Sequence, residues 1–139
     1  MKNILLAAAA IALSSCSATK TIGPDLNGEW DIVEVNGAAI DTTKTEFRPT
    51  LGFEIAKDNV YGCAGCNSIY GIARVNTAKQ TINFKEIGTT LMLCAKMEYE
   101  QQILKALEGV KAYKGAKDGR VDLTNASGKT LMTLKKQAK

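Results

Sequence analysis

Cysteine carries the clearest chemistry in this 139-residue sequence, because the chain contains four cysteines and no histidine. Without an imidazole the chain cannot form a Ser-His-Asp triad, a Cys-His dyad or a His-ligated zinc site. The four cysteines are Cys16, Cys63, Cys66 and Cys94. Most hydrolase chemistry is thereby excluded, and disulfide, thiol redox or lipid chemistry remains.

Cys63 and Cys66 have the CxxC spacing of thiol–disulfide oxidoreductases. Those enzymes place the first cysteine at a helix N-terminus, whereas here a glycine-rich corner leads into a predicted strand. No basic residue lies between positions 63 and 69 to lower a thiol pKa. A zinc site that includes Cys94 needs a fourth ligand that the sequence does not offer, so we predict no metal. A structural disulfide with one spare thiol is favoured over a redox pair.

Cys16 follows a segment typical of bacterial export. Lys2 precedes ten uncharged apolar residues at positions 4–13, a length suited to a signal peptide and too short to span a membrane. The sequence Leu13-Ser14-Ser15-Cys16 resembles a lipobox, in which cleavage before the cysteine exposes its thiol for acylation. We therefore predict a signal peptide over 1–15 and a lipidated Cys16. The alternative is an ordinary signal peptide with an incidental cysteine.

The residues after Cys16 predict a tether. Positions 17–25 are polar and small, with one glycine and one proline, so residues 16–25 are predicted to be the lipidated cysteine and a tether that reaches roughly 30 Å when extended. Ser17 stands where bacterial sorting rules, by resemblance, look for an aspartate that retains a lipoprotein in the inner membrane. We expect a lipid-anchored protein of the bacterial envelope, in the outer membrane and facing the periplasm, whose membrane contact is its acyl chains, such as palmitate.

The composition allows one domain over residues 26–139. The sequence is 45% hydrophobic and 23% charged, as in a globular protein. Residues 105–139 hold nine basic and three acidic residues. No ladder of aromatic residues accompanies the lysines, so a solvated face is favoured and no nucleic acid is expected as a partner.

The domain is predicted to be β-rich (α+β). Alternating or β-branched runs separated by turn residues predict strands at 26–35, 49–55, 60–61, 69–75, 81–84, 110–113, 120–124 and 130–134. Only 97–108 has helical spacing, with Ile103, Leu104 and Leu107 on one stripe and Gly109 as the stop. We expect a curved antiparallel sheet or half-open barrel closed by this one amphipathic helix.

Several short motifs, in order, resemble the META domain family of HslJ-like bacterial lipoproteins. They are Leu26-Asn27-Gly28-Glu29-Trp30, Gly62-Cys63-Ala64-Gly65-Cys66-Asn67, Ile82-Asn83-Phe84, the Thr90 to Cys94 stretch, the helix, and Val121-Asp122-Leu123 before Gly128-Lys129 and Leu131. The resemblance covers residues 26–134. It implies a barrel-like fold and a structural motif that includes Trp30, Gly65, Asn67 and Thr90.

The resemblance also implies that Cys66 and Cys94 are the family's cysteine positions and pair with each other. Cys63 departs from the family pattern, so the sequence leaves either Cys63 or Cys66 as the spare thiol. Gly65 suits a turn with positive φ or a close backbone approach, and Asn67 is able to fix the corner by bonding its own backbone. Both residues are therefore interpreted as structural, with no catalytic residue among them.

Two classes of function follow. The first is a non-enzymatic envelope lipoprotein, linked by resemblance to stress tolerance, that binds a lipid tail, a small apolar molecule or an envelope protein without a cofactor. The rival is a periplasmic thiol–disulfide protein that uses Cys63 and Cys66. An inhibitor of an envelope hydrolase is a third, weaker hypothesis.

Overall fold

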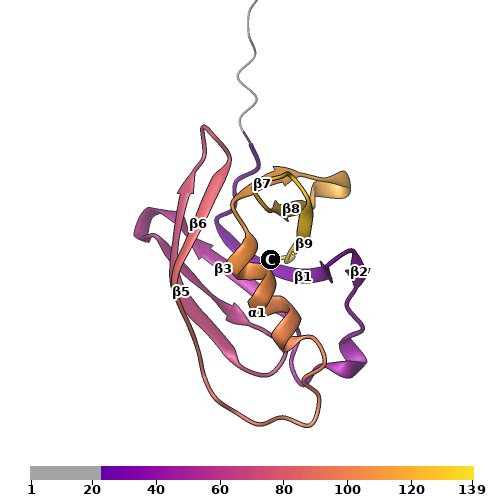
Figure 1. Cartoon of the computed structure of the whole chain (residues 1–139). Helices are drawn as coiled ribbons and strands as arrows, with labels where there is room; N and C mark the ends of the chain where they lie inside the picture. Colours follow the sequence, from indigo (N-terminus) through magenta and orange to yellow (C-terminus); the bar gives the residue numbers. More distant parts are fainter. Residues whose placement is uncertain (1–22) are drawn as a thin grey trace, which may run out of the picture.

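The computed structural model describes residues 23–139. The signal peptide, Cys16 and most of the tether predicted from the sequence lie outside these residues. The described chain contains nine strands, three 3-10 turns and one α-helix, α1 (Glu100–Gly109) (Figure 1). The strands are β1 (Gly28–Val35), β2 (Ala38–Ala39), β3 (Thr50–Glu54), β4 (Asn59–Cys63), β5 (Ser68–Asn76), β6 (Thr81–Thr89), β7 (Ala112–Gly115), β8 (Val121–Thr124) and β9 (Thr130–Lys136).

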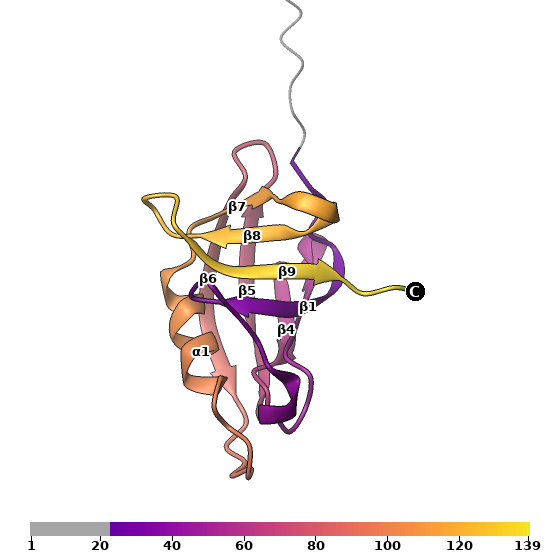
Figure 2. The same cartoon turned by 90° about the vertical axis from the view of Figure 1, so that its right-hand side faces the viewer.

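Eight of the strands close into an antiparallel barrel. They follow the order β1-β3-β4-β5-β6-β7-β8-β9, and β9 pairs back onto β1, as Figure 2 shows from the side. The short strand β2 follows the Asn36-Gly37 turn, where both residues have positive φ, and pairs with the last two residues of β1 on the edge opposite β9. The predicted β-rich fold, with a barrel and one helix, is confirmed.

The weakest seam of the barrel lies between β6 and β7. These strands share a single residue pair, Thr81 with Ala112, whereas β6 pairs with β5 along nearly its whole length. Over residues 83–89, β6 therefore has a strand neighbour on one side only. The connection from β6 to β7 contains α1, which lies beside this open stretch of wall (Figures 1 and 2).

The barrel interior is the hydrophobic core. Its largest buried side chains come from the strands, from Leu26 just before β1, and from α1, which contributes Ile103 and Leu107. Trp30 is also buried, and its indole Nε1 donates to the carbonyl oxygen of Leu26 at 2.8 Å. The ammonium of Lys136 lies 4.5 Å from the centre of the Trp30 ring, so this residue links β1 to β9 by packing and by a cation–π contact.

The helix begins three residues later than its periodicity predicts. Met97 forms an isolated antiparallel bridge with Thr45, and the chain first turns into the helix at Tyr99. Gly109 is the last helical residue rather than the first one outside, because Val110 is extended and its N–H bonds the carbonyl of Leu107. Within residues 23–139, no helix combines the length and apolarity that crossing a membrane requires.

Candidate functional site

The corner between β4 and β5 is a tight turn over residues 63–67. The N–H of Ala64 donates to the carbonyl of Asn67 at 2.9 Å, and Gly65 adopts a φ of 108°. The carbonyl of Gly65 accepts the N–H of Phe47 at 2.8 Å. The positive φ expected of Gly65 is therefore present, and it turns the carbonyl toward the segment that precedes β3.

The corner is covalently tied to the connection before α1. Cys66 and Cys94 form a disulfide across 28 residues of sequence, with their Cα atoms 6.0 Å apart. Cys63 is free and half-buried. The pairing implied by the family resemblance is confirmed, and it makes Cys63 the spare thiol.

The surroundings of Cys63 do not activate its thiol. Burial raises the pKa of Cys63 above its usual value, and the nearby negative charge of Glu100 raises it further. The N–H of Gly65, 3.3 Å from Sγ, acts in the opposite direction. Because burial is the largest cause, the thiol stays protonated at neutral pH and is a poor nucleophile.

Asn67 binds the connection after β6 through its side chain. Its Oδ1 accepts the hydroxyl of Thr90 at 2.8 Å and the N–H of Met92 at 2.6 Å, while its Nδ2 donates to the carbonyl of Met92 at 3.1 Å. The hydroxyl oxygen of Thr90 in turn accepts the N–H of Ser68. The expectation that the Asn67 side chain bonds its own backbone is wrong, because these partners lie more than 20 residues away.

Glu100 completes this arrangement from the first turn of α1. Its side chain is buried, with 4% of the residue exposed. One carboxylate oxygen accepts the N–H groups of Cys66 and Asn67 at 3.2 and 2.8 Å, and the other accepts Nδ2 of Asn67 at 2.6 Å. Sequence reasoning missed Glu100, because an acidic residue near a helix start is usual on a solvated face.

We call Cys66, Asn67, Thr90, Cys94 and Glu100 the corner clamp. Its members come from the β4–β5 corner, from the connection after β6 and from the start of α1. The clamp therefore sets where α1 begins relative to the barrel. Of the other two predicted motif residues, Gly65 shapes the corner, whereas Trp30 belongs to the core and makes none of these contacts.

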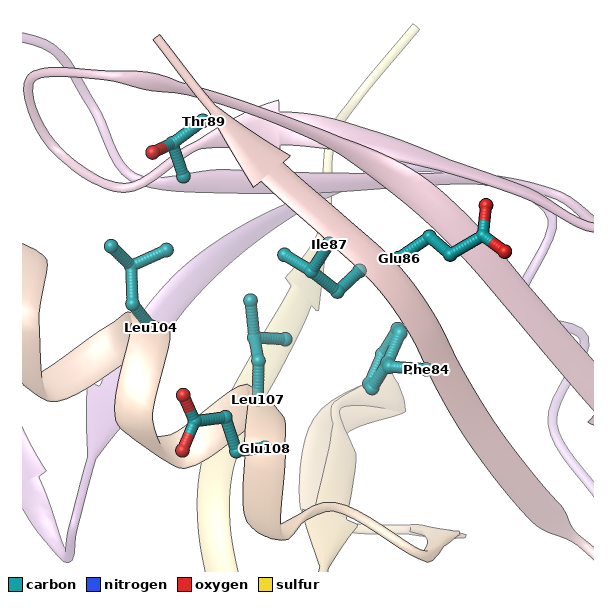
Figure 3. A pocket seen from close by; sticks show the side chains of 7 residues that line it. All are labelled: Phe84, Glu86, Ile87, Thr89, Leu104, Leu107 and Glu108. Carbon is teal, nitrogen blue, oxygen red and sulfur yellow. The ribbon is translucent and has the colours of Figure 1, made fainter. Parts of the chain in front are cut away.

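A cleft of about 390 Å³ lies between β6 and α1. Figure 3 shows Phe84 and Ile87 of β6 on one wall and Leu104 and Leu107 of α1 on the other. The remaining lining residues are Glu86, Thr89 and Glu108. The side chain of Glu86 projects away from the two leucines, so the middle of the cleft is apolar (Figure 3).

A bulge explains why both apolar side chains of β6 line the cleft. Phe84 and Ile87 are three residues apart and belong on opposite faces of a regular strand. The register with β5 shifts between Tyr70 and Ile72, and Glu86, opposite this shift, has a φ of 52°. The extra residue brings Ile87 back to the inner face, where it meets the helix.

The cleft suits reversible binding. Its size lies in the range of small-molecule pockets, and its lining provides no thiol or amine for covalent chemistry. In the part of the chain that the structure describes, no three His, Cys, Asp or Glu side chains converge as a metal site would require. The arrangement therefore offers an apolar surface with carboxylates at its margin.

The fold and the clamp together define a class of small antiparallel barrels whose wall is completed by a disulfide-tethered helix. Residues 23–138 match the META domain model, and the chain belongs to the META domain family. No curated protein sequence matches the chain significantly.

Two solved structures share the fold. A protein from Burkholderia xenovorans, determined by NMR, is 19% identical, with a TM-score of 0.62 over 100% of this chain and 99% of that one. A crystal structure of a DUF4847 family protein from Bacteroides vulgatus is 17% identical, with a TM-score of 0.53 over 78% of this chain and 92% of that one. At these identities the likeness concerns the fold alone.

The disulfide yields a first prediction. Replacing Cys94 by Ser should lower the free energy of unfolding by about 3 to 4 kcal/mol, because the cross-link restricts a 28-residue loop in the unfolded chain. Urea denaturation of the unreduced protein measures the change. Cys63→Ser is the matched control and should cost under about 1 kcal/mol. Equal losses in the two variants would contradict the pairing.

A second prediction concerns the buried carboxylate. In Glu100→Gln the amide NH₂ must face either Asn67 Nδ2 or the two backbone N–H groups, which are all donors. We expect a loss of about 1 to 3 kcal/mol in unfolding free energy, measured by urea denaturation. Glu98→Gln, which removes only an exposed ion pair with Lys44, should cost under about 1 kcal/mol. A Glu100 variant as stable as the wild type would show that the clamp does not depend on this charge.

Proposed function

We propose that this META domain protein is a non-enzymatic, lipid-anchored binding protein of the bacterial envelope that takes an apolar ligand in the cleft between β6 and α1. The cleft carries the proposal. Its four central side chains are apolar, and three of them, Phe84, Ile87 and Leu104, are only partly buried although they pack against the core. A ligand that covers them removes apolar surface from water, at roughly 25 cal/mol per Å².

The chemistry of the ligand follows from the walls. Aliphatic side chains from α1 and an aromatic ring from β6 fit an acyl chain, another small apolar molecule or an apolar segment of an envelope protein. Residues 83–89 of β6 pair with a strand on one side only, so their backbone groups on the other side are able to pair with an extended segment. The META resemblance supports a role in envelope stress tolerance for such binding.

The anchor rests on the lipobox-like sequence before Cys16. The domain begins within ten residues of that cysteine, since Leu26 is fully buried in the barrel. Such spacing suits a tether that leaves the barrel close to a bilayer. Ser17 favours the outer membrane, and we place the barrel on its periplasmic face. No nucleic acid and no cofactor are part of the proposal.

Two observations weigh against the rival thiol–disulfide function. Cys66 is bonded to Cys94 in the corner clamp, so the CxxC pair does not form a redox disulfide. The pKa of Cys63 is raised, which is opposite to the shift that an attacking thiol needs. A binding role leaves both features in place, because a stable disulfide and an inert thiol are compatible with it.

The anchor is tested by metabolic labelling. In cells fed a radiolabelled fatty acid, the wild-type chain should incorporate the label and sediment with membranes. Cys16→Ala should lose the label and leave the membrane fraction, or accumulate unprocessed, because it lacks the acylated thiol. Label that persists in Cys16→Ala would refute lipidation at this position, and Cys63→Ala serves as the control that keeps it.

The cleft is tested with N-phenyl-1-naphthylamine, an apolar dye that fluoresces when it leaves water. The barrel from residue 23 should bind the dye, and Leu104→Gln should weaken binding by about tenfold, because about 1.4 kcal/mol of apolar contact is lost. Leu91→Gln, a change outside the cleft, is the control and should bind as the wild type does. No dye binding, or equal binding by Leu104→Gln, would contradict the proposed site.

A further inference from the structure

The large apolar side chains that the described chain exposes gather at one end of the barrel. They are Phe47, Tyr70, Leu91, Met92 and Leu93. Leu91 and Leu93 are each 96% exposed, which leaves almost the whole side chain in water. Phe47 bonds the corner through its N–H, and the Tyr70 hydroxyl lies 3.5 Å from the carbonyl of Thr89. We call this set the apolar tip.

The tip is rigidly supported. Met92, between the two exposed leucines, has both its N–H and its carbonyl bonded by the Asn67 side chain. Thr90 on one side and the Cys94 disulfide on the other fix the flanking backbone. Leu91 and Leu93 are therefore held outward by the same clamp that positions α1. A preorganised apolar projection of this kind loses little conformational entropy on binding.

The tip lies at the end of the barrel opposite the point where the tether arrives. Gly23 lies against Gln80 at the start of β6, whereas Leu91 follows the end of that strand (Figure 1). Eleven residues of extended chain separate Gln80 from Leu91, or roughly 35 Å. The seven residues from Cys16 to Gly23 reach about 25 Å at full extension. An anchored barrel that stands upright on this tether therefore directs its tip away from its own bilayer.

The charges near the tip also argue against a lipid surface. Lys96 is the only charged residue between positions 90 and 97, and the nearby Lys44 is paired with Glu98. Binding to anionic lipid headgroups uses clusters of basic residues, each worth about 1 kcal/mol. The tip offers apolar contact without such a cluster.

The projecting shape of the tip favours a groove on a different protein over a symmetric pair of copies. In a two-fold interface the same patch meets itself, so projecting leucines would oppose projecting leucines. We propose that the apolar tip docks into an uncharged apolar groove of another envelope protein. This inference rests on the proposed function in one respect, because the lipid anchor sets the direction in which the tip points. It does not depend on the ligand proposed for the cleft.

The test places a photoreactive benzoylphenylalanine at position 91 of the full chain in cells. The control carries it at exposed Lys79, in the turn between β5 and β6. We expect position 91, and not position 79, to crosslink one defined protein. Lipid adducts, adducts between two copies of this chain, identical products at both positions, or no product at position 91 would each overturn the proposal.

The crosslinked protein is then purified and its Kd for the mature chain in lipid nanodiscs is measured. Leu91→Ser combined with Leu93→Ser should raise the Kd about 100-fold, while Lys79→Ser and Leu104→Gln should leave it unchanged. Both leucines are exposed, so the melting temperature of the double variant should match the wild type. Equal Kd values for the wild type and the double variant would refute docking through the apolar tip. Fatty-acid labelling and dye binding report on the anchor and the cleft separately, so each proposal can fail alone.

Discussion

The hydrogen bonding of the buried Glu100 carboxylate is the interaction on which the corner clamp and the position of α1 depend. A charge with 4% exposure is stable in a protein interior only when donors surround it, and here three N–H groups do so. Two of those donors are backbone groups of a corner that exists because Gly65 adopts a positive φ. The corner, the connection after β6 and the start of α1 therefore form one cooperative unit, which the disulfide reinforces.

This unit solves a problem that the barrel topology creates. A seam of one residue pair between β6 and β7 leaves part of the wall without a strand, and the apolar interior behind it needs cover. Helix α1 supplies that cover, but it is fixed at its N-terminal end by hydrogen bonds and a covalent link rather than by packing alone. The face of α1 that points toward β6 does not pack tightly against that strand, and a cleft remains between them. Tighter packing would have filled this space with core side chains.

The same clamp bears on both proposed surfaces. It sets one wall of the cleft through the position of α1, and it holds Leu91 and Leu93 in water through Asn67. The exposed leucines and the partly buried wall of the cleft leave apolar surface in contact with water. A fold selected for stability alone would bury this surface. With the tether arriving at the far end of the barrel, an anchored chain can present the cleft and the tip at the same time.

The strand order along the chain, the single helix and the turn at Asn36-Gly37 were all determined by local sequence, because alternation, helical spacing and turn chemistry act over a few residues. The Cys66–Cys94 pair was accessible only through the family resemblance. Tertiary structure alone decided the bulge that turns Phe84 and Ile87 to one face, the distant partners of Asn67 and the burial of Glu100. Each of these depends on contacts between segments far apart in sequence. A side chain's type does not reveal such partners, because the same glutamate is equally suited to a solvated helix start.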